Sequence, residues 1–158
     1  MKIAALPHKS RRRSAAAAAA TVIAVIVTPT ATAKAETVGD NANLNVEQPC
    51  SGNGRVECRF PRPISCVASA ACKYTVRVEG RAPGGLSVQA CVSGSCSGTQ
   101  SGTGTVLAEL ANGRFPRFQS ALDFYGVGTS DNIADNIDVV VRIQAWGIGC
   151  GSAGGGCL

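Results

Sequence analysis

The acidic residues are the main candidates for catalysis, because the sole histidine of this 158-residue chain, His8, lies near its N-terminus. A pair of carboxylates can hydrolyse a glycosidic bond without histidine. The sequence contains no GxSxG, phosphate-binding loop, dinucleotide fingerprint or HExxH motif, and its spacing places no two acids across a cleft. We therefore expect no enzymatic activity, with a small histidine-free hydrolase as the alternative. Its acids would come from Glu79, Glu109, Asp123 and residues 131–138.

The tetrapeptide Arg-Phe-Pro-Arg occurs twice, at residues 59–62 and 114–117. Proline fixes φ and lacks an N–H donor, so each copy is expected at a strand edge or in an exposed extended segment. Such a segment could be a recognition loop, and Arg59 beside Cys58 could enter the acidic pocket of a trypsin-like protease. We favour two ordinary strand ends with both phenylalanines in the core, because the match is short. The candidate binding residues are Arg59, Phe60, Arg62, Arg114, Phe115 and Arg117.

Trp146 is the only tryptophan, and it completes the set of candidate binding residues. On an outward face, with Phe124 and Tyr125, it would form a platform for a sugar or a peptide. The alternative, which we favour, places these aromatic rings in the core.

Residues 131–138 are rich in carboxylates and amides, which are groups that calcium binds. The segment lacks the glycine and the terminal glutamate of an EF-hand, and Asp and Asn are common in turns, so we expect an Asx-rich turn. With no C-x-x-C motif and no histidine after His8, we expect neither a metal site nor a cofactor.

The N-terminal segment has the pattern of a signal peptide. Basic residues between His8 and Arg13 precede an uncharged, alanine-rich stretch that ends in A-x-A sequences at 31–33 and 33–35. We expect removal of residues 1–35, leaving a mature domain of residues 36–158. Six of the fifteen Lys and Arg residues lie in the removed part, so nine basic residues face ten acidic ones and the net charge is about −1. This balance argues against a nucleic-acid partner, and no membrane span is expected in the mature chain.

All eight cysteines follow the predicted cleavage point, and an exported chain with an even number of cysteines is expected to form disulfides. Short glycine-containing and serine-containing loops favour the local pairs 91–96 and 150–157. Four further cysteines could pair among themselves in three ways, and the spacing does not choose between them. The eight residues are Cys50, Cys58, Cys66, Cys72, Cys91, Cys96, Cys150 and Cys157.

The domain that must position these residues is predicted to be all-β. Segments rich in β-branched or aromatic residues alternate with Gly, Pro, Ser and Asn, and residues 73–79 and 137–146 show period-two alternation. Residues 105–111 could instead form a helical turn, but the Asn-Gly that follows favours a strand. We expect an antiparallel two-sheet sandwich stabilised by disulfides, with a small β-barrel as the alternative. The predicted strands are 56–60, 64–68, 73–79, 86–92, 105–111, 117–127 and 137–146.

These observations together predict a secreted, non-catalytic module that binds an extracellular protein or glycan through its surface or loops. The three subtypes are a protease inhibitor, an adhesive or envelope-surface module and a carbohydrate binder. The expected location is extracellular, with retention at the cell envelope as the alternative.

Overall fold

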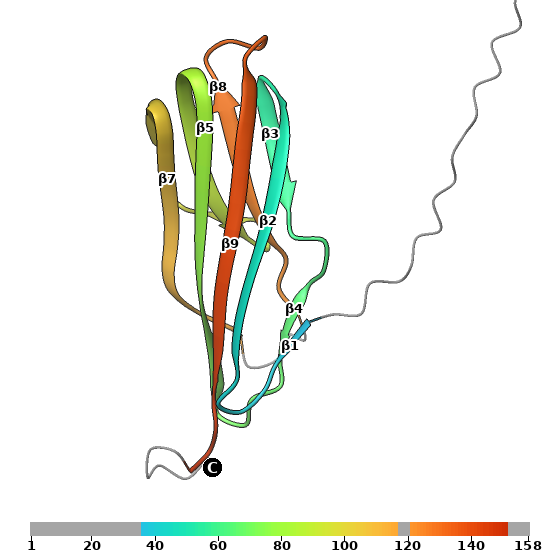
Figure 1. Cartoon of the computed structure of the whole chain (residues 1–158). Helices are drawn as coiled ribbons and strands as arrows, with labels where there is room; N and C mark the ends of the chain where they lie inside the picture. The colour runs from blue at the N-terminus through green and yellow to red at the C-terminus, as the bar shows by residue number, and fades with distance from the viewer. Residues whose placement is uncertain (1–35, 117–120, 152–158) are drawn as a thin grey trace, which may run out of the picture. The chain divides into compact units, whose positions relative to one another are not determined.

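Strands are the only regular elements among the residues that the computed structural model describes, 36–116 and 121–151 (Figure 1). The all-β prediction is therefore confirmed. The predicted signal peptide, residues 1–35, lies outside the described residues. Within the described part, no helix is long and apolar enough to cross a membrane. The strands are β1 (Glu36–Val38), β2 (Asn43–Asn53), β3 (Arg55–Arg59), β4 (Ile64–Cys66), β5 (Ala71–Val92), β6 (Ser95–Cys96), β7 (Gln100–Arg114), β8 (Phe124–Ser130) and β9 (Asn136–Ile148).

Seven strands form one antiparallel sheet in the order β2-β9-β5-β8-β3, with β6 and β7 also paired to β5. The antiparallel prediction is confirmed for this sheet. Strands β1 and β4 form a separate parallel pair, which was not expected.

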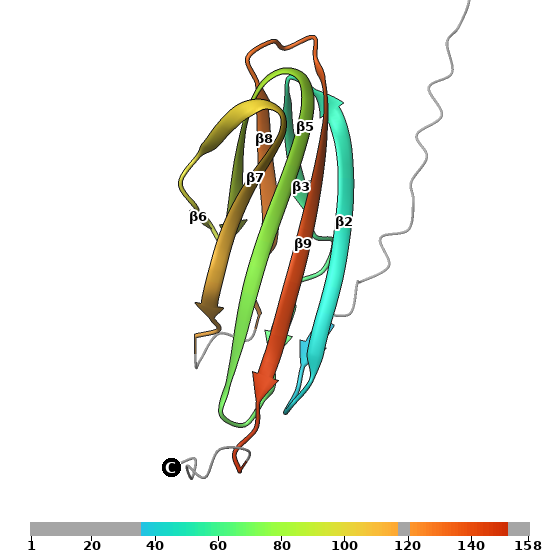
Figure 2. The same ribbon diagram turned by 60° about the vertical axis from the view of Figure 1, so that its left-hand side comes forward.

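Strand β5 folds the sheet over itself. Residues 71–81 of β5 pair with β9, residues 86–92 pair with β8, and β7 pairs with both halves. The bend lies at the same end as the β8–β9 turn in both views (Figures 1 and 2). One layer therefore contains β2, β9 and the first half of β5, and the other contains β3, β8 and the second half. This curled sheet fits both the predicted sandwich and the predicted small barrel.

The core lies between the two layers and follows from period-two alternation. Five alternate residues of β9 are at most 2 % exposed, and β5 adds Val76 and Val78, which are fully buried. Glycine in β8 allows the layers to approach closely, because a Cβ on Gly126 would lie 2.5 Å from a methyl carbon of Val78. The alternate residues of β9 are Ile137, Val139, Val141, Ile143 and Ala145.

Three disulfides join pairs of strands within the described residues. Cys91–Cys96 joins β5 to β6, which confirms the predicted local pair. Of the three pairings open to the four cysteines between 50 and 72, the structure has Cys50–Cys58 and Cys66–Cys72. Cys50–Cys58 connects β2 to β3, the two ends of the sheet order, across the turn at Gly54. The predicted pair 150–157 includes a residue outside the described part and stays a prediction.

Several predicted strand boundaries differ from the structure. Segments 73–79 and 86–92 are halves of one strand, and the strand predicted at 64–68 ends at Cys66. Of the strand predicted at 117–127, residues 117–120 are outside the described part and β8 begins only at Phe124. Between them, Leu122 makes a single bridge to Ile64. Strands β1 and β2 were not predicted.

The register of β9 yields a first prediction. Val141 is fully buried, whereas its neighbour Val140 points outward and is partly exposed. Val141→Asn should lower the free energy of unfolding by about 3 kcal/mol or more, because it buries an amide among apolar side chains. Val140→Asn should lower it by less than about 1 kcal/mol. Urea denaturation measures both, and equal losses would show that the register is wrong.

The Cys50–Cys58 bridge yields a second prediction. Replacing both cysteines with alanine should lower the free energy of unfolding by about 3 kcal/mol, since the bridge restrains the two ends of the curled sheet. The matched variant Cys91→Ala/Cys96→Ala should lose less, about 2 kcal/mol, because its loop is shorter. Chemical denaturation compares the two, and a larger loss at 91 and 96 would contradict the expectation.

Candidate functional site

The outward side of the layer that contains β9 carries the candidate site, and we call it the outer face. Alternation along β9 turns every second side chain away from the core, and the register aligns each with neighbours on β2 and β5. Three rows result across β2, β9 and β5. They are Asn43–Trp146–Lys73, Asn45–Gln144–Thr75 and Glu47–Arg142–Arg77.

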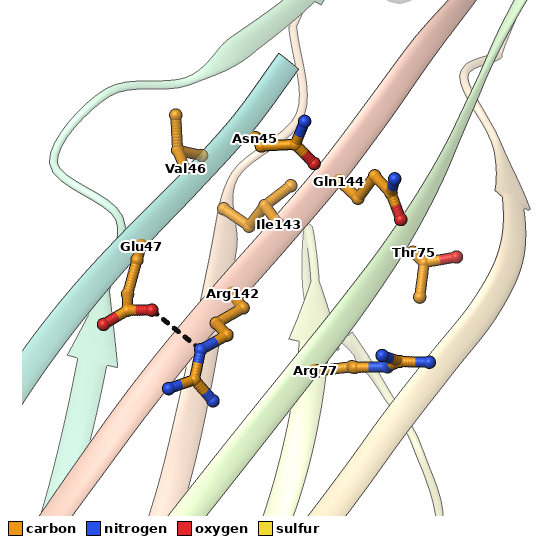
Figure 3. Close-up of a pocket in the computed structure, with 8 residues that line it drawn as sticks. All are labelled: Asn45, Val46, Glu47, Thr75, Arg77, Arg142, Ile143 and Gln144. Carbon is orange, nitrogen blue, oxygen red and sulfur yellow. Dashed lines mark hydrogen bonds and ion pairs between the residues drawn. The ribbon is translucent and has the colours of Figure 1, made fainter. Parts of the chain in front are cut away.

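An open hollow of about 370 Å³ lies over the middle of these rows. Figure 3 shows Asn45, Gln144 and Thr75 side by side on β2, β9 and β5. Their two amides and one hydroxyl make no side-chain hydrogen bond to any described residue, so their donors and acceptors face solvent. The lining residues are Asn45, Val46, Glu47, Thr75, Arg77, Arg142, Ile143 and Gln144.

A second hollow of about 350 Å³ continues the outer face toward the bend of β5. Arg142 lines both hollows and separates them. In the second hollow, the Ser51 hydroxyl donates to the Asp138 carboxylate at 2.8 Å. The lining residues are Pro49, Cys50, Ser51, Glu79, Arg81, Asp138, Val140 and Arg142.

Ion pairs fix the orientation of Arg142 between the hollows. Its Nε donates to Glu47 at 2.7 Å and its Nη1 donates to Glu79 at 2.9 Å. Glu79 also accepts from Arg81 at 2.6 Å. Hydrogen bonds from Arg142, and then from Arg81, lower the pKa of Glu79 below its ordinary value. The carboxylate is therefore held in its charged form.

Trp146 lies on the outer face, in the row next to the first hollow. Its neighbours in the chain, Ala145 and Gly147, are buried, and Trp146 itself is partly exposed. The structure thus places Trp146 on the outward side of β9, and the expectation that Trp146 lies in the core is wrong. The row of Trp146 is adjacent to the row that carries the amides of the hollow.

The two Arg-Phe-Pro-Arg copies place their phenylalanines in the core, as the sequence favoured. Phe115 is 6 % exposed, and its ring centroid lies 5.5 Å from that of Tyr74 and 6.2 Å from that of Phe124. Phe60 packs partly buried against the same core, and its N–H donates to the carbonyl of Phe124 at 2.9 Å.

The arginines of the two copies lie apart. Arg59, on β3, lies 4.3 Å from the ring centroid of Tyr125 and donates to Glu57 at 2.6 Å. Arg62 is exposed between two prolines, while Arg114 lies opposite Lys73 at the end of β7. Arg117 is outside the described residues. The structure therefore brings Arg114 to the outer face with Trp146, and places Arg59 on the other layer.

The first part of the segment 131–138 forms the predicted Asx-rich turn, over residues 131–135, and residues 136–138 begin β9. The Asn132 Oδ1 accepts from the N–H of Ala134 at 3.0 Å, and the Asp135 carboxylate accepts from Ser130 at 2.8 Å and from Asn132 at 3.2 Å. Among residues 36–116 and 121–151, no three His, Cys, Asp or Glu side chains are grouped so that they could hold a metal ion.

Most residues of the hollows were not binding candidates in the sequence. Those on β2 were missed because β2 was not recognised as a strand, and those on β5 and β9 come together with them only through the pairing of the three strands. A signal was present in the N-terminal half of β2, where Leu44 and Val46 alternate with polar residues. No protein-family model matches this chain, and no curated protein matches its sequence. What the site binds is therefore inferred from its own residues.

The Glu79–Arg142 contact yields a third prediction. In the folded protein the pKa of Glu79 should lie below its ordinary value of 4.5, and Arg142→Gln should raise it toward that value. Because the folded pKa is lowered, the contribution of this carboxylate to stability is present above its unfolded pKa and is lost as the pH falls through the folded pKa. An NMR titration of the carboxyl carbon measures the shift. Arg77→Gln is the control, since Arg77 pairs with Glu109 instead; an equal rise in that variant would contradict the assignment.

Proposed function

We propose that this protein is a secreted, non-catalytic module that binds a glycan on its outer face. The observation that carries the proposal is the open hollow in which Asn45, Gln144 and Thr75 lie in line beside the outward Trp146. Two amides and one hydroxyl that make no side-chain hydrogen bond to a described residue, next to an aromatic ring, match the two sides of a sugar, its hydroxyl edge and its apolar C–H face.

The extended shape of the outer face suits a chain of several sugar units. Alternate residues of a strand lie about 7 Å apart, so Trp146, Gln144 and Arg142 form successive contact points along β9. The second hollow extends the same surface beyond Arg142. Because strands fix the backbone of these residues, no loop has to be ordered on binding, and this favours affinity.

The carboxylates of the outer face support binding over hydrolysis. A glycosidase needs one carboxyl group with a raised pKa as its general acid. The pKa of Glu79 is lowered by its arginine partners. Glu47 and Glu109 are likewise paired, with Arg142 and Arg77. These three glutamates therefore orient arginines, and none of them has the free carboxyl group that a general acid needs.

Export is supported by the cysteine chemistry and the N-terminal sequence. Three disulfides in a small domain are typical of proteins in an oxidising, extracellular environment. The basic segment, the alanine-rich stretch and the A-x-A sequence at 33–35 fit a secretory signal. An extracellular module of this kind would meet glycans of a cell envelope or matrix.

The single tryptophan gives a direct test, our fourth prediction. Titration with soluble cello-, chito- and uronic-acid oligosaccharides should change the fluorescence of Trp146 with at least one of them. By calorimetry, Trp146→Ala should weaken that binding about 10-fold or more through lost stacking, equivalent to about 1.4 kcal/mol. Asn45→Ala/Gln144→Ala should weaken it similarly by removing hydrogen bonds.

Tyr125→Ala is the matched control, because Tyr125 is an outward aromatic residue on the other layer. Its variant should bind as the wild type does. If no oligosaccharide binds, or if Tyr125→Ala reduces affinity as much as Trp146→Ala, the outer face is not a glycan site.

A further inference from the structure

Two cations lie directly opposite each other at one end of the outer face. Lys73 of β5 is in register with Arg114 of β7, and on its other side Lys73 is in register with Trp146 of β9. Arg114 is exposed and Lys73 is partly exposed. The row therefore runs from the indole to two adjacent positive side chains.

Like charges at directly opposite positions of neighbouring strands destabilise a sheet unless they are compensated. Arg77 and Arg142 form a second pair of opposed cations on the same face, and in this pair the positive charges are compensated. Each of these arginines binds a glutamate, Arg77 at 3.0 Å and Arg142 at 2.7 Å.

Within residues 36–116 and 121–151, Lys73 and Arg114 have no such partners. No carboxylate of the described residues forms an ion pair with either of them. General basicity does not explain the pair, because beyond residue 35 the chain has nine basic and ten acidic residues. A local positive charge that the fold leaves uncompensated is complementary to an anion supplied by a ligand.

We propose that Lys73 and Arg114 bind the anionic group, a carboxylate or a sulfate ester, of an acidic glycan whose ring lies on Trp146. This inference rests on the proposed function and narrows its ligand class. The planar guanidinium of Arg114 can form two parallel hydrogen bonds with such a group, and the Lys73 ammonium adds a point charge. The remaining sugar units extend from Trp146 over the amides of the first hollow.

The test compares matched neutral and acidic oligosaccharides on the protein expressed from the full 158-residue sequence. The probes are oligogalacturonate, its methyl ester and a sulfated oligosaccharide of equal length, each titrated by calorimetry. We expect at least one anionic probe to bind at least about 10-fold more tightly than the neutral ester, and this preference to shrink as salt rises.

Lys73→Gln/Arg114→Gln should abolish the preference by lowering the affinity for the anionic probe to that for the neutral ester. The matched control is Arg55→Gln/Arg59→Gln, which removes two cations from β3 on the other layer and should keep the preference. The single variants Lys73→Gln and Arg114→Gln are measured as well, so that a poorly folding double variant does not decide the result. Each single variant should lower the preference several-fold.

The outcomes separate this inference from the proposed function. Equal binding of the neutral and anionic probes, or an anionic preference that survives Lys73→Gln/Arg114→Gln, overturns the inference and leaves glycan binding intact. No binding of any probe overturns both. Equal binding of the anionic probes, an acidic peptide and single-stranded DNA, unaffected by Trp146→Ala, would show charge attraction without recognition of a sugar and would also overturn the inference.

Discussion

The pairing of one strand with partners in both layers is the constraint on which the fold depends. The 22-residue β5 forms backbone hydrogen bonds with β9 in its first half and with β8 in its second, while β7 pairs along both. The bend packs against the β8–β9 turn, where the N–H of Asp131 donates to the carbonyl of Gly85 at 3.1 Å. A Cβ at Gly85 would collide with the Asp131 carboxylate, so a larger residue there would displace this side chain.

The same strand determines both sides of the layer that carries the site. Period-two alternation buries Val76 and Val78 and thereby turns Thr75, Arg77 and Glu79 outward. The registers with β9 and β7 then decide which side chains they meet. The core and the outer face are therefore two consequences of one register, and a slip by one residue would eliminate both.

The sequence predicted the features that depend on local residue patterns. It did not predict the features that depend on pairing between strands distant in the chain. Alternation identified β9, and turn residues identified the Cys91–Cys96 bridge. The Pro83-Gly84-Gly85 sequence indicated a break, yet β5 continues because β7 follows it around the bend. Strand β2 was missed because its inward side chains are only partly buried at the end of the sheet, which weakens the hydrophobic pattern. Trp146 and Arg114 were found by residue type, but their common row depends on two registers that no local signal contains.

The polar composition of the outer face is not required by the fold. Its ion pairs are largely exposed, with Arg142 and Glu47 at 46 % and 53 % side-chain exposure, and such pairs contribute little to stability. The amides of Asn45 and Gln144 form no side-chain hydrogen bonds within the described residues, and the opposition of Lys73 and Arg114 is unfavourable on its own. A sheet face needs only soluble side chains to remain folded. The outer face orients arginines, leaves two amides without side-chain hydrogen bonds to described residues and places two cations beside the only tryptophan. The stability of the sheet requires none of these features, whereas the proposed binding function depends on them.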